Sequence, residues 1–202
     1  MEQRYIPFKE VTTRSDENGS PILEGYFVRY DDVYDVAPGA TESIARGAFT
    51  ESIHGDVRAL YNHNSDIVLG RVSAGTLELE DRDLGLWGRI KINPKDSQAM
   101  DAYERIARKD IQGCSFGFNV EKESTEVRDD GSVHWTIEKV NPLFEVSPCV
   151  FPAYESTSIE ARKRDLDEIK KRQAEAWEKR MKERLQGHGT ETVDAEEKER
   201  QW

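Results

Sequence analysis

The chain has 202 residues, of which 36% are hydrophobic and 34% are charged, enough for one domain with a core and an appendage. Its formal net charge of −11 at pH 7 repels phosphate backbones and disfavours nucleic-acid binding. No apolar run reaches the roughly 20 residues that a membrane span needs, and the N-terminus lacks the apolar segment of a secretory signal. We therefore expect an intracellular protein that binds neither nucleic acid nor membrane.

The first third of the chain alternates strand-like runs with one helical segment. Tyr5–Phe8, Ile22–Tyr30 and Val57–Tyr61 are rich in branched and aromatic residues, which is typical of strands. Between the last two, Thr41–Ile53 carries Ile44, Ala48 and Phe49 at helical spacing, which predicts a helix.

A hairpin and a second helix are expected next. Thr76–Glu80 and Leu86–Ile92 lie on either side of the turn Asp81-Arg82-Asp83, a pattern that predicts a hairpin with one buried face. Pro94–Ile111 begins with proline, which suits the first turn of a helix, and continues with apolar residues at helical spacing.

Three further strands complete the folded part of the chain. Ser115–Val120 and His134–Val140 are separated by a turn at Asp129–Gly131, and Leu143–Val150 follows. Many short strands with few helices predict an α+β fold. Its centre is expected to be a closed or nearly closed, mostly antiparallel β-barrel flanked by a few helices.

The composition changes abruptly after Tyr154. Ile159–Leu185 consists almost entirely of Lys, Arg, Glu, Asp and Ala with a thin apolar stripe, which predicts a solvated helix. Glu191–Trp202 is expected to be disordered. We therefore divide the chain into a folded domain at 1–155 and a charged helical and disordered tail at 156–202.

Ser115 and His63 are the first candidates for chemistry. Ser115 begins an apolar strand, and Gly113 and Gly117 leave room for a substrate carbonyl to reach its hydroxyl. The same glycines would also fit a bulge or a close strand crossing. Among the four histidines, His63 differs in following an apolar strand directly, at its exit. An isolated histidine is more often a hydrogen-bonded structural residue, so the context must decide its role.

Glu145 is the third candidate, because it lies in a strongly apolar strand. A buried carboxylate needs a donor partner, and a histidine N–H is that partner in a Ser-His-acid triad. The alternative is a solvent-facing glutamate on an alternating strand.

Cysteine and metal chemistry have weaker support. Cys114 and Cys149 form no CxxC pair and are expected to be small, buried, apolar side chains. His63 and Asp66 form the only compact pair, without a further ligand at metal-site spacing. We expect neither a metal nor another cofactor.

Five groups of residues follow one another between residues 20 and 155. They are Glu24-Gly25-Tyr26, Gly47-Ala48-Phe49, Tyr61-Asn62-His63 with Leu69-Gly70, Ser115-Phe116-Gly117-Phe118, and Glu145-Val146-Ser147 with Pro152-Ala153-Tyr154. In order and approximate spacing these groups resemble the prohead proteases of tailed bacteriophages. This family is similar in fold to herpesvirus assemblins, which use a second histidine where Glu145 is the matching residue here.

The resemblance implies roles for individual residues. Ser115 would be the nucleophile, His63 its general base and Glu145 the acid that orients the histidine. The oxyanion donors would come from the loop that follows the third triad strand. Pro152 has no N–H, so Ala153 or Tyr154 would be the donor.

The resemblance also implies a task and a set of partners. The chain would be an endopeptidase packaged in the procapsid, in the host cytoplasm. It would cut the scaffolding segment from the major capsid protein, or a separate scaffold protein, and cut itself. We further expect self-association as a homodimer or a larger assembly. From the change of composition after Tyr154, we also expect the tail, from about residue 156, to deliver the enzyme to the procapsid and then to be removed by self-cleavage.

Two alternatives remain open. One is a cysteine protease that uses Cys114, but successive strand residues point to opposite faces, so Cys114 and Ser115 cannot both face His63. The resemblance favours Ser115. The other is an inactive scaffold or capsid-assembly protein with the same fold.

Overall fold

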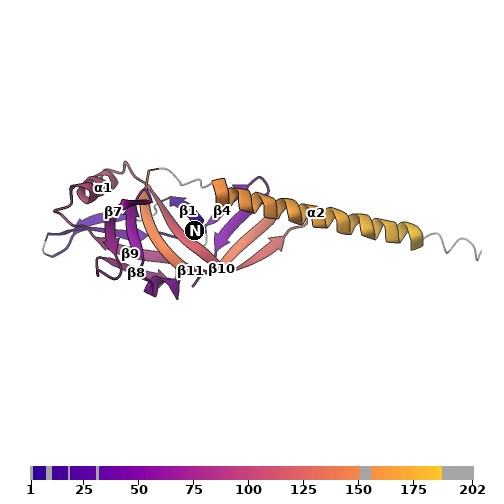
Figure 1. Ribbon diagram of the computed structural model, residues 1–202, viewed down its shortest axis with the longest axis horizontal. Coiled ribbons are helices and arrows are strands. Elements are labelled where there is room, and N and C mark those ends of the chain that lie inside the picture. Colours follow the sequence, from indigo (N-terminus) through magenta and orange to yellow (C-terminus); the bar gives the residue numbers. More distant parts are fainter. Residues whose placement is uncertain (1, 8–10, 18, 31, 151–155, 188–202) are drawn as a thin grey trace, which may run out of the picture. The chain divides into compact units, whose positions relative to one another are not determined.

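The computed structural model describes residues 2–7, 11–17, 19–30, 32–150 and 156–187. The chain divides into two compact units, Met1–Glu160 and Ala161–Trp202. The first unit contains all the described strands, arranged in two sheets, together with the helix α1 (Ser97–Ala107) (Figure 1). An α+β fold made mostly of strands is therefore confirmed.

The larger sheet has seven strands and is organised around β11 (Val133–Cys149). Along its main path the order is β1 (Glu2–Pro7), β10 (Gly113–Val127), β11, β5 (Ala40–Ile44) and β4 (Val33–Ala37). β6 (Arg58–Tyr61) also pairs with β11, and β7 (Asn64–Arg71) pairs with β6.

β11 connects three neighbours, because it is long enough to pair with different strands at its two ends. Its first residues run parallel to β5, from Val133 to Ile137. Glu145 and Val146 run parallel to β6, and β10 lies antiparallel along almost its whole length. The strand that carries Glu145 therefore lies between the strand that carries Ser115 and the hairpin that carries His63.

The smaller sheet has four antiparallel strands. Their order is β2 (Thr12–Ser15), β3 (Pro21–Tyr26), β9 (Gly85–Lys91) and β8 (Leu77–Arg82). The predicted hairpin at residues 76–92 is confirmed as β8 and β9. The turn requires Gly85, because its φ is +150° and a Cβ atom there would lie 1.9 Å from the carbonyl oxygen of Val28.

The buried core of the first unit contains one face of β10. Phe116 and Phe118 are fully buried and stack with ring centroids 4.8 Å apart, and Phe49 meets Phe116 edge to face at 5.7 Å. Side chains alternate along a strand, so Ser115 and Gly117 lie on the opposite face of β10. The apolar packing of Phe116 and Phe118 thus fixes the orientation of the serine.

The helix predicted at Thr41–Ile53 is wrong. Residues up to Ile44 belong to β5, which pairs with β4 and β11, and only Ser52–His54 form a short 3-10 helix. Gly47, with φ at +79°, interrupts any helix between them. Strand pairing on both sides of β5 outweighs the helical spacing of Ile44, Ala48 and Phe49.

Several predicted strands have other bounds in the structure. The closed or nearly closed barrel stays a prediction. β10 continues to Val127, and β11 is one strand where two were expected. β2, β4, β5 and β7 were not predicted. The described strand pairings form two sheets whose order does not close on itself.

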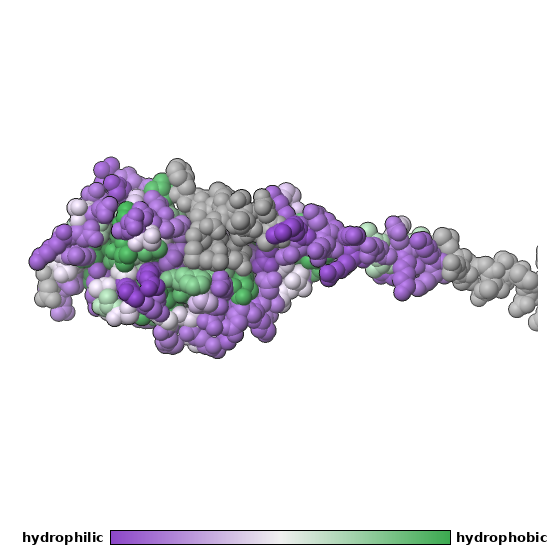
Figure 2. Space-filling model, in the orientation of Figure 1, coloured by the Kyte–Doolittle hydropathy of each residue, from purple (hydrophilic) through white to green (hydrophobic). Residues whose placement is uncertain are grey.

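Two predicted helices are confirmed. α1 begins later than Pro94 because Asp96 caps it, and the Asp96 carboxylate accepts from the N–H groups of Gln98 and Ala99 at 3.0 and 3.2 Å. α2 (Ser156–Gly187) is a single long helix, and the face of it that Figure 2 shows is predominantly hydrophilic. Neither described helix is long and apolar enough to span a membrane. Glu191–Trp202 lies outside the described residues.

An ion-pair cluster on the smaller sheet makes its stability depend on pH. Glu24 accepts hydrogen bonds from Arg14 and Arg89, each at 2.8 Å. The Arg14 hydrogen bond, more than the Arg89 one, lowers the pKa of Glu24 from 4.5 to about 2. A carboxyl group with a lower pKa in the folded state stabilises that state above its unfolded pKa. The contribution is lost as the pH falls from 4.5 towards 2.

Glu24→Gln is therefore expected to lower the free energy of unfolding by about 1 kcal/mol at pH 7, after allowance for solvent screening. The difference from the wild type should shrink as the pH falls below 4.5. Urea unfolding at a series of pH values measures both effects. Glu80→Gln is the control, because Glu80 pairs with Arg82 on a more exposed part of the same sheet. A constant difference between pH 7 and pH 3 would contradict the prediction.

Candidate active site

His63 lies in a tight turn between two paired strands. Tyr61 of β6 pairs with Asn64 of β7, so Asn62 and His63 are the two residues of the turn. Both have positive φ, 51° and 58°, as in a type I′ hairpin turn. Asn and His tolerate this region better than most residues, but it still costs about 1 kcal/mol compared with glycine. The chain accepts backbone strain to place a histidine here.

Asn62 fixes this turn to the end of β11. Its backbone N–H donates to the carbonyl oxygen of Pro148 at 3.0 Å. Its side-chain oxygen accepts from the N–H of Val150 at 2.9 Å. These two bonds hold the turn against β11, so the position of His63 is set relative to the strand that carries Glu145.

Glu145 is buried and binds His63 directly. The carboxylate is only 4% exposed, and its Oε1 lies 2.8 Å from Nδ1 of His63. Its Oε2 accepts a hydrogen bond from the hydroxyl of Ser147 at 2.5 Å. A carboxylate only accepts hydrogen bonds, so the shared proton of a neutral imidazole lies on Nδ1. Nε2 then carries a free lone pair, as a general base requires.

Ser115 faces the same side of the sheet as Glu145. Ser115 pairs with Ser147, and Gly117 pairs with Glu145, in the antiparallel register of β10 and β11. Side chains of directly opposed residues lie on the same face. Gly117 has no side chain, so nothing from β10 crowds Glu145 at the opposed position. The register thus brings Ser115, Ser147 and Glu145 together on one face.

Two buried polar atoms in this region have no hydrogen-bond partner among the described residues. They are the hydroxyl oxygen of Ser115 and Nε2 of His63. Buried polar atoms are nearly always paired, so an exception calls for an explanation. One of these groups is a proton donor and the other is a proton acceptor. A hydroxyl and an imidazole nitrogen that are both uncommitted can exchange a proton when a substrate arrives.

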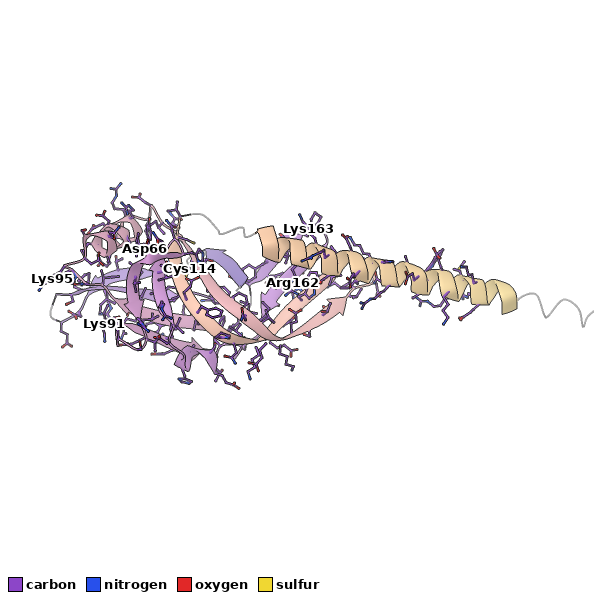
Figure 3. The ribbon with its side chains drawn as sticks, viewed as in Figure 1. Asp66, Lys91, Lys95, Cys114, Arg162 and Lys163 are labelled. Atoms are coloured by element: carbon purple, nitrogen blue, oxygen red, sulfur yellow. The ribbon has the colours of Figure 1, made fainter. Side chains whose placement is uncertain are left out.

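Cys114 does not suit the role of nucleophile. It precedes Ser115 and therefore points to the other face of β10; its labelled position lies on that strand (Figure 3). Burial, above all other effects, raises the pKa of its thiol well above 9.0. A thiolate is the reactive form of cysteine, so almost none would be present near neutral pH.

The other acidic and histidine candidates lie apart from this cluster. Asp66 is exposed on β7 (Figure 3), and it is Glu145 that binds His63. His134 has both ring nitrogens bonded to hydroxyl groups, those of Thr41 and Ser43, which is a structural role.

Two further sequence-based expectations concern the oxyanion donors and a metal site. Ala153 and Tyr154, the predicted oxyanion donors, lie outside the described residues. Within the described part of the chain, no cluster of three or more His, Cys, Asp or Glu residues could hold a metal ion.

Comparison with known proteins identifies the family of the chain. Residues 9–172 match the family described as Caudovirus prohead serine protease. The chain belongs to this family. It is therefore a peptidase of a family that acts in prohead maturation.

Individual proteins are also similar to the chain. The prohead protease of Enterobacteria phage HK97 is 27% identical over 179 residues, which cover 86% of this chain and 75% of that protein. The solved structure of the bacteriophage T4 capsid assembly protease is 12% identical and covers 74% of this chain and 99% of its own, with a TM-score of 0.43.

Ser147 and Asn62 lie beside the candidate triad of this prohead protease family member, and the sequence predicts no role for either, although both stand in the groups that resemble the family. Ser147 is two residues after Glu145 on a strand, a spacing that places both side chains on one face. Asn62 precedes His63 in a two-residue turn, where asparagine is preferred at the first position. Both signals are present in the sequence, but each becomes specific only when the partner strand is known.

Proposed function

We propose that the chain is a capsid-maturation endopeptidase that uses Ser115, His63 and Glu145 as its triad. The main support is the hydrogen bond from Nδ1 of His63 to the buried Glu145 carboxylate. This hydrogen bond uses Nδ1, so Nε2 of His63 has no hydrogen-bond partner among the described residues, and neither has the hydroxyl of Ser115. In a chain of the prohead serine protease family, this arrangement fits acyl transfer.

The proposed reaction begins with the hydroxyl of Ser115. Its oxygen attacks the scissile carbonyl carbon while Nε2 of His63 takes the hydroxyl proton. Glu145 stabilises the imidazolium that forms. His63 then gives the proton to the leaving amine, and water hydrolyses the acyl-enzyme by the same steps in reverse order. The backbone N–H of Ala153 or Tyr154 is the proposed donor to the oxyanion.

The proposed substrate is the scaffolding segment of the major capsid protein, or a separate scaffold protein, and the protease itself. The reaction would take place inside the procapsid in the host cytoplasm. Self-association as a homodimer or larger assembly is part of this proposal. The acidic net charge of −11 argues against nucleic acid as a partner.

The proposed role of the tail is delivery to the procapsid. α2 is rich in charges of both signs, and Lys163 is one of many charged side chains along it (Figure 3). Its exposed apolar residues include Trp177 and Met181, which lie four residues apart and so share one helix face. We propose that the tail localises the enzyme by binding weakly within the procapsid, where confinement replaces tight affinity.

A truncation after Glu160, where the first compact unit ends, tests that role. The shortened chain is expected to keep its peptidase activity in solution and to be incorporated into proheads at least several-fold less than the full chain. Quantitative immunoblots of purified proheads measure incorporation. A shortened chain that is incorporated normally, or one that is folded but inactive, would contradict the proposal.

Co-expression with the major capsid protein of the same phage tests the enzyme function. Intact-mass measurement of both proteins should show a shortened capsid protein with the wild type and a full-length one with Ser115→Ala. The mass of the protease chain reports at the same time on self-cleavage within the tail. Unchanged masses with a folded wild-type chain would favour the inactive assembly protein instead.

A further inference from the structure

Ser147 lies at the centre of the site, but neither the family comparison nor the triad assigns it a role. It is fully buried and is opposed across the sheet to Ser115. Its hydroxyl donates to Oε2 of Glu145 at 2.5 Å. We propose that Ser147 is a positioning residue, which fixes the Glu145 carboxylate on His63 and so maintains the base. This inference rests on the proposed function.

The geometry around Glu145 supports this role. One carboxylate oxygen binds His63 and the other binds Ser147. A carboxylate held at both oxygens cannot rotate away from the imidazole. Ser147 therefore holds the Glu145 carboxylate in the place where it can face the imidazolium in the transition state.

The direction of the Ser147 proton also affects Ser115. Glu145 can only accept, so the single hydroxyl proton of Ser147 is committed to it. Ser147 has none left to donate to the opposed Ser115. The hydroxyl of Ser115 has no partner among the described residues and stays available to His63. Ser147 thus binds the acid and leaves the nucleophile free.

Loss of the Ser147 hydroxyl would leave Oε2 of Glu145 buried without a hydrogen-bond partner among the residues that the structure describes. Such a carboxylate must find another donor or reorient, and either change removes the fixed alignment of His63. The expected consequence is a slower chemical step. A serine that only fills space would have no such effect on Ser115.

The experiment compares two substitutions that differ in a single group. Ser147→Thr keeps the hydroxyl group. Valine has nearly the same shape as threonine but carries a methyl group where threonine has the hydroxyl, so Ser147→Val removes the hydrogen bond to Glu145. The probe is a biotinylated fluorophosphonate, which reacts with a serine activated by a histidine and needs no knowledge of the natural substrate. The readout is the second-order rate constant for labelling of Ser115, with the labelled residue identified by peptide mass spectrometry.

We expect Ser147→Val and Ser147→Ala to label about 10- to 100-fold more slowly than the wild type, by analogy with the loss of hydrogen-bond partners that orient metal-binding histidines and carboxylates. Ser147→Thr should recover most of the rate. In a Glu145→Gln background, Ser147→Ala should cause no further loss, because Ser147 acts through Glu145. Ser52→Ala is the matched control. Ser52 is also a buried serine with one hydrogen bond, to the carbonyl oxygen of Phe49 at 3.1 Å, and its loss should leave the rate unchanged.

The possible failures are distinct. Equal rates for the Thr and Val variants would overturn the role of Ser147 and leave the proposed function intact. If circular dichroism shows that the Ala and Val variants both fail to fold, Ser147 is a structural residue and the inference is likewise overturned. A folded wild-type chain that is not labelled at Ser115 would instead overturn the proposed function.

Discussion

Replacement of Ser115 or His63 by alanine is expected to lower kcat by about 10⁴- to 10⁶-fold. The double variant should be no slower than either single variant, because nucleophile and base act as a unit. Ser115→Ala removes the attacking oxygen, and His63→Ala removes the group that takes its proton. Hydrolysis of a peptide that spans a capsid-protein cleavage site measures the loss, and thermal unfolding checks that both variants fold.

His63→Gly separates stability from activity at the same residue. Glycine adopts the positive φ of this turn without steric cost, so this variant should unfold at a temperature no lower than His63→Ala. It should be equally inactive. Cys114→Ala is the control for the nucleophile and should retain activity. Clearly additive losses, or an active Ser115→Ala that a thiol-alkylating reagent inactivates, would show that Ser115 is not the nucleophile.

Glu145→Gln is expected to reduce kcat by about 10³- to 10⁴-fold while KM changes little. The amide has nearly the same size as the carboxylate but can present N–H groups to Nδ1 of His63. That contact favours the imidazole tautomer with the proton on Nε2, which cannot accept a proton from Ser115. The carboxylate acts mainly in the transition state, where the imidazolium forms, so binding of the substrate is largely unaffected.

Steady-state kinetics over a range of peptide concentrations separates kcat from KM. Asp66→Asn is the matched control, because Asp66 is an exposed carboxylate on the strand that follows His63. It should leave both constants unchanged. A fully active Glu145→Gln would show that the triad uses another acid or none.

Much of the fold could be predicted from local patterns. The β8–β9 hairpin, α1 and α2 were predicted because periodicity and turn residues act over a few neighbouring positions. The prediction of a helix at Thr41–Ile53 is wrong, because contacts with distant parts of the chain determine the structure there. β5 is a strand because β4 and β11 pair with it, and those partners lie elsewhere in the sequence. Similarly, β10 and β11 exceed their apolar runs because they pair with each other as far as the turn at Asp129–Gly131.

For the site, the sequence by itself determined which residue types could react. A serine between glycines, a histidine after an apolar strand and a glutamate in an apolar strand are local features, and each had a plausible structural explanation. Only the tertiary structure decided that Glu145 binds His63, that Asp66 does not lie in this cluster, and that Ser147 completes the carboxylate's hydrogen bonds. The physical reason is that these contacts depend on strand register and on the fixing of the His63 turn by Asn62. The apolar pattern of a strand restricts its register, but the register also depends on which strand is its partner, and β6 and β11 pair although they lie far apart in the sequence.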